Sequence, residues 1–396
     1  MQIEERPRAE EIYQSLSRQL APYVEELSAC ESTTELVDQP AYRLCRELVS
    51  ELLTTIDRGD CTGVAAPART RYRFAAWNIE RGTQLEAQIE AFTTHEYLRT
   101  SDVVLLTECD VGMARSGNHA VTRKMARALG FHYAFAPCYF SLVKGSGLEY
   151  YTPGENEVGL HGNAVLSRYP IGRVRAIPLK NGIDKMAGRE KRLGCQTALA
   201  ADIEFPNLTL TAVSVHLDAN STQRHRCEQM RHILDAVDNG QPVLLGGDWN
   251  TSTYNSSRAF HAIMGFALRV LMGVDNVIRN HYLYPERRFE RELFRLLEAR
   301  GFDYSRCNQL GERTAGYSIG DAKARHNLGE WVPGWCFAFI RWSLRNHGGQ
   351  CPLKLDWFAS RGLRCEEPVI IHEFREGREV PLSDHDPIGV DVIATP

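Results

Sequence analysis

The stretch Val243-Leu244-Leu245-Gly246-Gly247-Asp248-Trp249-Asn250 is the best guide to the fold of this chain. A short apolar run that leads into a carboxylate is typical of a buried strand that ends at a site. Residues two apart on a strand point to the same side, so Asp248 and Asn250 should project together. A carboxylate and a carboxamide side by side suit a hard cation and a phosphate oxygen. The same Asp-x-Asn pattern also forms simple turns, so the interpretation depends on the other strands.

Further strand-like runs end in, or contain, polar residues of the same chemical kinds. They are Asn78 after Phe74–Trp77, Glu108 after Val103–Thr107, His216 after Leu210–Val215, Asp384-His385-Asp386 after Leu382-Ser383, and Asp356 inside Leu355–Phe358. A buried carboxylate is costly unless it has a partner or a metal. The set therefore predicts a site that is built where several strands end.

These motifs, in this order, resemble the endonuclease/exonuclease/phosphatase superfamily, which includes pancreatic-type deoxyribonucleases, abasic-site endonucleases, neutral sphingomyelinases and inositol-polyphosphate 5-phosphatases. The resemblance extends from about Tyr72 to Val392 and lies in WNIERG (Asn78), LLTECD (Glu108), HGNAVLSRYP (Asn163), SVHL (His216), GGDWN (Asp248, Asn250), LDW (Asp356) and SDHDP (Asp384, His385). It implies a four-layer α/β sandwich of two mixed β-sheets with helices outside and the site at one end. It leaves the substrate open, because the superfamily acts on very different phosphate esters.

The resemblance implies metal-dependent hydrolysis of a phosphoester. We expect Glu108 to be the principal metal ligand, with Asn78 beside it and Asp384 joining them or holding metal-bound waters. Oxygen ligands favour Mg²⁺, with Mn²⁺ able to substitute. Zinc is disfavoured, since the sequence shows no cluster of Cys or His.

His385 is the expected general base, and the resemblance makes Asp356 the partner that fixes its tautomer. Asp248 should orient the attacking water and share in its deprotonation, and the division of labour between Asp248 and His385 stays open. Asn250 is expected to bind a phosphate oxygen, and His216 to donate a hydrogen bond to the phosphate.

Two further residues are candidates for substrate binding. Asn163 should reach the same phosphate oxygen. Arg115, in Arg115-Ser116-Gly117-Asn118, offers a guanidinium and a helix N-terminus to an anion, or belongs to an ordinary loop with Asn118 as a helix cap. For His161, His225 and Asp386 we favour roles outside the reaction, and for Arg189, Lys191 and Arg192 a solvated charge cluster.

Composition indicates a soluble globular protein. The chain has 396 residues, of which 43% are hydrophobic and 24% charged. The sequence shows no apolar run long enough to span a membrane and no hydrophobic signal core, which favours a cytoplasmic location. The 11 cysteines are scattered and lack Cys-x-x-Cys spacing, which favours reduced thiols. The net charge is −4, and residues 1–63 contribute 13 acidic and 6 basic side chains, which leaves +3 for the remainder. This net positive charge is smaller than that expected of a protein that binds duplex DNA non-specifically.

The periodicity predicts a helical extension over residues 1–63, followed by a catalytic domain over 71–396. The recurring apolar residues of the extension are Ile12, Leu16, Leu20, Tyr23 and Leu27, then Ala41, Leu44, Leu48 and Leu52. Residues 254–350 fit the family core poorly and form an insertion. Its aromatic residues Trp331, Trp335, Phe337, Phe339 and Trp342 either pack on the sheets or form an apolar wall beside the site.

The expected activity is that of a phosphodiesterase. We rank nucleic acid or nucleotide first as substrate, a phospholipid headgroup second, and a sugar or inositol phosphomonoester third. The competing class is a non-catalytic scaffold of the same fold. The complete set of expected ligands and catalytic residues argues against it.

Overall fold

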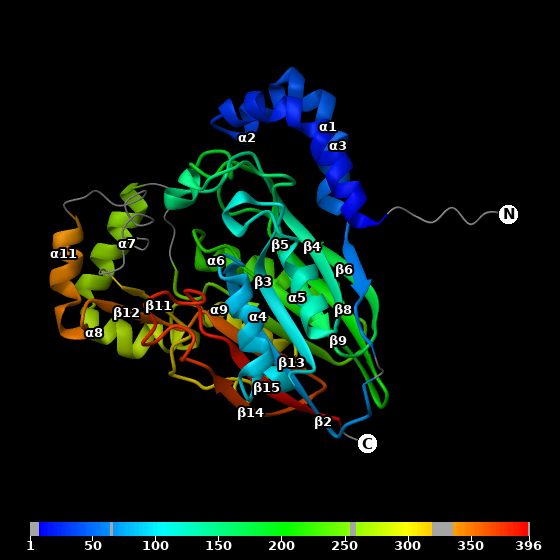
Figure 1. Ribbon diagram of the computed structural model, residues 1–396. Helices are drawn as coiled ribbons and strands as arrows, with labels where there is room; N and C mark the ends of the chain where they lie inside the picture. Colours follow the sequence, from blue (N-terminus) through cyan, green and yellow to red (C-terminus); the bar gives the residue numbers. More distant parts are fainter. Residues whose placement is uncertain (1–7, 64–65, 254–258, 319–335, 395–396) are drawn as a thin grey trace.

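Two β-sheets pack face to face, and helices cover their outer faces (Figure 1). The computed structural model describes residues 8–63, 66–253, 259–318 and 336–394. Sheet A contains β14 (Arg364–Ile370), β15 (Ile388–Ile393), β2 (Arg71–Arg81), β3 (Val103–Val111), β5 (Leu160–Ser167), β4 (His132–Ser141) and β1 (Asp57–Asp60) in spatial order, with β7 (Arg192–Gly194) paired to β4. Sheet B contains β13 (Asp356–Arg361), β10 (Val243–Asp248), β9 (Leu208–His216), β8 (Thr197–Phe205) and β6 (Ile171–Pro178).

Both sheets are mixed. The pairs β2–β3 and β9–β10 are parallel, whereas the other neighbouring pairs are antiparallel. The expected four-layer α/β sandwich is therefore confirmed.

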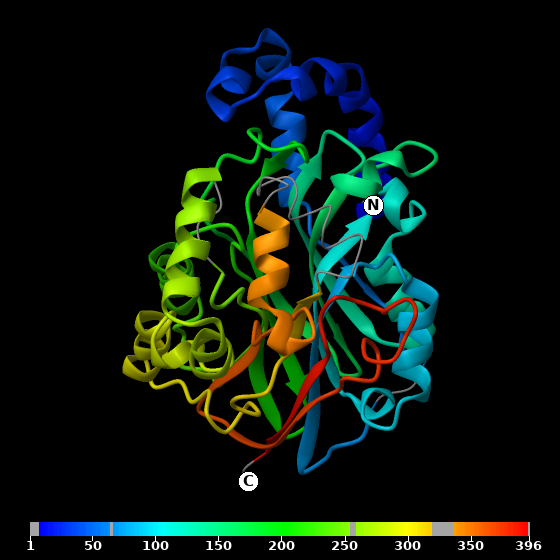
Figure 2. The same cartoon turned by 90° about the vertical axis from the view of Figure 1, so that its left-hand side faces the viewer.

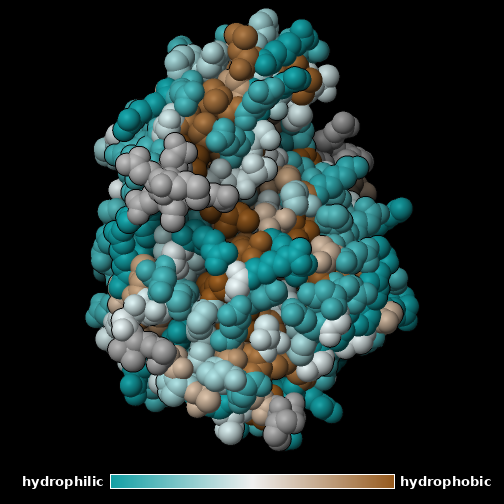
Figure 3. Space-filling view, turned by 90° about the vertical axis from the view of Figure 1, so that its right-hand side faces the viewer, coloured by the Kyte–Doolittle hydropathy of each residue, from teal (hydrophilic) through white to brown (hydrophobic). Residues whose placement is uncertain are grey.

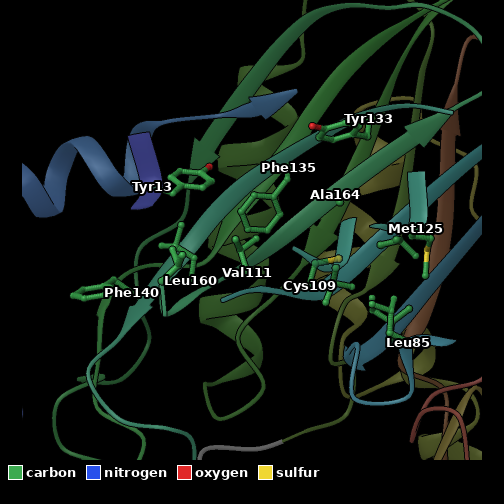
Figure 4. Packing of buried hydrophobic residues seen from close by; sticks show 14 of the residues in the cluster. Tyr13, Leu85, Cys109, Val111, Met125, Tyr133, Phe135, Phe140, Leu160 and Ala164 are labelled. Atoms are coloured by element: carbon green, nitrogen blue, oxygen red, sulfur yellow. The ribbon is translucent and has the colours of Figure 1, made fainter. Parts of the chain in front are cut away.

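Alternation along the strands separates the apolar side chains into layers. On β2, Phe74 and Ala76 face the core between the sheets, while Ala75 and Trp77 face the helices outside sheet A. The outer helices of sheet A include α4 (Leu85–Thr94) and α5 (Val121–Leu129), and those of sheet B are α6 (Gln223–Ala236) and α9 (Arg291–Ala299). Figure 4 shows Met125 of α5 and Leu85 of α4 in the cluster that covers sheet A.

The N-terminal extension is helical, as expected, with α1 (Ala9–Ala29), α2 (Thr33–Asp38) and α3 (Pro40–Thr54). The expectation for Leu44 is wrong: its side chain is 73% exposed, and Cys45 and Val49 fill the core instead. The helix phase explains this result, because positions 41, 45, 49 and 52 share one face of α3. Tyr13 of α1 packs in the same cluster as β4 and β5 (Figure 4).

The extension is tied to loops of the sandwich. The Ser17 hydroxyl donates to the carbonyl of Val158 at 3.2 Å, and Nζ of Lys191 donates to the carbonyl of Cys30 at 2.7 Å. The boundary near residue 63 remains a prediction, but β1, which precedes it, already pairs with β4 in sheet A.

Thr222 caps α6 by accepting a hydrogen bond from the backbone N–H of His225, while the Ser221 hydroxyl donates to the carbonyl of Asp218. At α5 the expected cap is not formed. Asn118 does not cap α5; its amide bonds to the backbone of Glu155 and Glu157.

The insertion leaves and re-enters the sandwich at one end. Asp248, the last residue of β10, lies opposite Asp356, the first residue of β13, so the intervening chain emerges there. It contains α7 (Ala259–Leu271), α8 (Val274–Val277), α9, β11 (Ala315–Ser318), α11 (Cys336–Ser343) and β12 (Gln350–Leu353). Figure 2 views the side on which α7 and α11 lie. On the opposite side, hydrophilic side chains surround a central group of hydrophobic ones (Figure 3).

Part of the insertion belongs to the sandwich itself. Phe294 of α9 packs edge-on against Trp357 of β13, with ring centroids 4.6 Å apart. Trp331 and Trp335 lie outside the described residues. Trp342 of α11 is exposed, with the guanidinium of Arg345 4.5 Å from its ring centroid.

The glycine pair that precedes Asp248 is sterically required. Gly247 has φ +133°, and a Cβ there would lie 2.3 Å from the carbonyl oxygen of Val215. We expect Gly247→Ala to lower the free energy of unfolding by about 3 kcal/mol, since backbone strain and crowding add. Chemical denaturation would measure the change. Gly240→Ala is the matched control, because Gly240 also has positive φ but no atom near its Cβ position; equal losses for both variants would contradict the steric argument.

Candidate active site

Irregularities in strand pairing set the directions of the polar side chains that lie at the ends of β2 and β3. The pairing of β2 with β3 shifts between Asn78 and Arg81, and that of β3 with β5 shifts between Leu106 and Cys109. Glu108, inside the second shift, has φ +57°, a conformation that is uncommon for a residue other than glycine. Such bulges redirect a side chain beside a functional site.

Asp248 is the centre of the polar cluster. Its carboxylate accepts hydrogen bonds from Nδ2 of Asn78 at 3.2 Å, from the backbone N–H of Asn250 at 2.8 Å and from Nδ2 of Asn250 at 3.1 Å. Nε2 of His216 lies 3.5 Å from the same carboxylate, and Nε2 of His385 lies 3.8 Å away. Burial raises the pKa of Asp248, and the neighbouring His385 opposes that rise.

His385 is held by Asp356. Its Nδ1 lies 2.8 Å from Oδ2 of Asp356, and its carbonyl accepts a hydrogen bond from Nε1 of Trp77 at 2.9 Å. Burial alone would lower the pKa of His385, but the carboxylates of Asp356 and Asp248 outweigh it and raise the pKa well above its usual value. The structure thus places His385, Asp356 and Asp248, three of the residues expected to be catalytic, beside one another.

Glu108 is held in its ionised form. It accepts a hydrogen bond from Nδ2 of Asn78 at 3.2 Å, and Nε of Arg81 lies 3.9 Å away. Burial alone would raise the pKa of Glu108, but Arg81 and His216 outweigh it and hold the pKa well below its usual value. Asp384 is exposed, and its carboxylate accepts from the Ser383 hydroxyl at 3.5 Å.

His216 reaches across the cluster. Nε2 lies 3.9 Å from Glu108 as well as close to Asp248, while Nδ1 is buried without a hydrogen-bond partner among the described residues. Burial lowers the pKa of His216 despite these carboxylates.

The two asparagines expected to bind phosphate already have internal partners. Nδ2 of Asn250 donates to the carbonyl of Leu217 at 2.9 Å as well as to Asp248. Nδ2 of Asn163 donates to the carbonyl of Thr197 at 2.8 Å, and its Oδ1 is buried without a partner among the described residues. Their phosphate-binding roles remain predictions.

Arg115 is surrounded by carboxylates. It makes a bidentate contact with Asp110 at 2.8 and 3.0 Å and further contacts with Glu149 at 3.0 Å and Glu190 at 2.8 Å. Its side chain is 1% exposed. In this arrangement the guanidinium is bound by carboxylates of the protein, and binding of a substrate anion by Arg115 remains a prediction.

The cluster fits a divalent cation. Mg²⁺ is typically bound through one or two carboxylates and keeps several waters, and Glu108 with the exposed Asp384 offers such oxygens. A second set, Asp248, Asp356 and His385, has ligand atoms within 4.8 Å of one another. Oδ1 of Asp356 is buried without a partner among the described residues, so a cation would satisfy it.

A family profile decides the classification. The model of the endonuclease/exonuclease/phosphatase family matches residues 75–353, which is more than two thirds of the chain. The chain belongs to this family. Members of the endonuclease/exonuclease/phosphatase family hydrolyse phosphoesters, so this chain is a phosphoester-hydrolysing enzyme. Enzymes of the family generally depend on a divalent metal.

Solved structures that are similar to this chain include the following three. An endonuclease/exonuclease/phosphatase from Beutenbergia cavernae is 16% identical, with 82% of this chain and 72% of that chain covered and a TM-score of 0.46. A 3′–5′ exonuclease from Neisseria meningitidis is 14% identical (80% and 98% covered, TM-score 0.43). The human Nocturnin catalytic domain is 14% identical (85% and 96% covered, TM-score 0.45). A search of curated proteins gives no significant match.

Some polar residues near the site did not stand out in the sequence. No sequence motif identifies Asp110 or Arg81 as site residues, and the sequence favours a role outside the reaction for His161. The alternation of His161, Asn163 and Val165 along one strand is the sequence feature that places His161 on the same face of the strand as Asn163. His225 and Asp386 do have structural partners: His225 contacts Asp218, and Asp386 accepts hydrogen bonds from Arg375. No helix within the described ranges has the length and apolar character needed to cross a bilayer.

Proposed function

We propose that this chain is a divalent-metal-dependent phosphodiesterase. The observation that carries the proposal is the convergence of Asp248 with Asn78, His216 and His385 at one end of the sandwich. Acidic, amide and imidazole groups are what hydrolysis of a phosphodiester requires, because the negative charge must be neutralised and a water activated.

Glu108, with Asn78 and Asp384, would hold Mg²⁺ or Mn²⁺. The bound cation supplies charge neutralisation at the phosphate. Asp248 and the neutral form of His385 would orient a water and accept its proton, with Asp356 fixing the tautomer of His385. His216 and Asn250 donate hydrogen bonds to the phosphate oxygens as negative charge develops.

We place nucleic acid or a nucleotide first among the substrates. Tyr150 and Tyr151 are 55% and 76% exposed and follow Glu149, whose carboxylate lies 3.1 Å from Arg81 beside Glu108. Exposed aromatic rings near a phosphate site are suited to stacking on bases.

A phospholipid headgroup is the second candidate, because the insertion exposes apolar side chains at the end of the sandwich where the site lies. These are Met264, Leu268 and Leu271 of α7 and Trp342 of α11. Exposed apolar groups of this kind contact lipid surfaces. A sugar or inositol phosphomonoester is the third.

Hydrolysis of bis(p-nitrophenyl) phosphate and of p-nitrophenyl phosphate, with Mg²⁺, Mn²⁺ or EDTA, tests the reaction type. We expect diester cleavage that EDTA reduces by at least about 10²-fold, since the cation supplies several kcal/mol of transition-state stabilisation. Cleavage of the monoester alone would replace the proposal with a phosphatase. Single-stranded DNA and RNA oligonucleotides, compared with sphingomyelin vesicles, then separate the two leading substrate classes.

A further inference from the structure

A second histidine faces the site from sheet A. On β5, Val165 lies in the core between the sheets, and Asn163 donates across that core to Thr197 of β8 in sheet B. Because side chains two apart on a strand share a face, His161 also points into the space between the sheets. It occupies the end of β5 nearest Glu108, since β5 runs antiparallel to β3.

Sheet B presents His216 toward the same space. Ser214, two residues before His216 on β9, donates to the carbonyl of Leu106 in sheet A at 2.8 Å. His216 therefore points toward sheet A, as His161 points toward sheet B. His161 acts electrostatically on both Glu108 and His216.

Asp110 fixes the orientation of His161. It lies directly opposite His161 in the β3–β5 register, with 2.8 Å between Nδ1 of His161 and Oδ1 of Asp110. Asp110 is itself buried and held by Arg115 through two hydrogen bonds. The Nδ1 nitrogen is thus committed, and Nε2 is the nitrogen left to meet a ligand.

We propose that His161 binds the phosphoester directly in its doubly protonated form, in which Nδ1 donates to Asp110 and Nε2 donates a hydrogen bond to a phosphate oxygen, on the side of the site opposite His216. This inference rests on the proposed phosphodiesterase function. It makes the Asp110–His161 pair a substrate-contacting counterpart of the Asp356–His385 pair.

Direct coordination of a cation by His161 fits less well. Within the described part of the chain, the group of acidic and histidine ligands that converges within 4.8 Å contains Asp248, Asp356 and His385 but not His161. His161 therefore lies outside that candidate cation site.

The test compares His161→Ala and His161→Gln with the wild type on bis(p-nitrophenyl) phosphate. We expect His161→Ala to lower kcat/KM by about 10²–10³-fold, the range for loss of one donor to a developing oxyanion. The glutamine amide can replace an Nε2 donor, so His161→Gln should recover at least about tenfold of that loss. His132→Ala is the control, since His132 also pairs with a carboxylate, that of Asp60, but stands at the other end of β4.

Binding of Mn²⁺, measured by calorimetry, and the melting temperature should stay at wild-type values in His161→Ala. If the wild type is active and His161→Ala has the same kcat/KM, the proposed role of His161 is overturned while the proposed function stands. Loss of Mn²⁺ binding in the variant would also overturn it, because His161 would then be a metal ligand. A wild type that cleaves no phosphoester would refute the proposed function together with this inference.

Discussion

Replacement of His385 by alanine should lower kcat for phosphodiester hydrolysis by about 10²–10⁴-fold, the range for loss of a general base. The expectation follows from the position of the imidazole, whose Nδ1 is bound to Asp356 while Nε2 faces Asp248. Steady-state kinetics on bis(p-nitrophenyl) phosphate would measure the fall, with circular dichroism to confirm folding.

Asp356→Asn should approach the same loss. The amide of asparagine removes the negative charge that stabilises an imidazolium and allows the wrong tautomer. His132→Ala again provides the control, because it removes a carboxylate-paired histidine from the far end of β4. Near-normal turnover by folded His385→Ala protein would contradict the assignment.

Glu108→Gln should reduce both cation affinity and activity. The substitution keeps the shape of the side chain and an acceptor for Asn78 but removes the charge. A cation at a phosphate contributes several kcal/mol to transition-state stabilisation, so we expect kcat/KM to fall by at least about 10²-fold. Titration of Mn²⁺ by calorimetry and of activity against Mg²⁺ would measure the two effects.

Higher Mg²⁺ should partly restore the activity of Glu108→Gln, because a weakened site can be filled by mass action. Glu90→Gln is the control, since Glu90 is an exposed carboxylate of α4. Unchanged Mn²⁺ affinity in an inactive Glu108→Gln protein would remove Glu108 from the metal site.

The strands that carry the site were predictable because apolar alternation and a polar strand end are local properties. Asp248, for example, ends a run whose inner and outer residues separate cleanly in the structure, with Leu244 between the sheets and Leu245 beneath the helices. The pairing of β8 with β9 is local as well, because only two residues separate these strands along the chain.

The environment of Arg115 was not predictable, because it depends on distant loops. Its carboxylate partners Glu149 and Glu190 lie 34 and 75 residues along the chain. Spacing in a single sequence does not show which charges such loops bring together.

The exposed position of Leu44 has a simpler cause. A periodic apolar pattern predicts a helix, but the face of the helix that packs against the core is the one with the larger apolar area.

The order of strands in sheet A has a consequence for synthesis of the protein. β2, formed by residues 71–81, pairs on one side with β15, formed by residues 388–393, and Trp77 bonds the backbone of His385 across 308 residues. A nascent chain therefore carries Asn78 and Glu108 for most of its translation without the strand that places His385 beside them. Hydrolytic activity should arise only after β15 has emerged from the ribosome, and chains that are truncated before β15 should be inert.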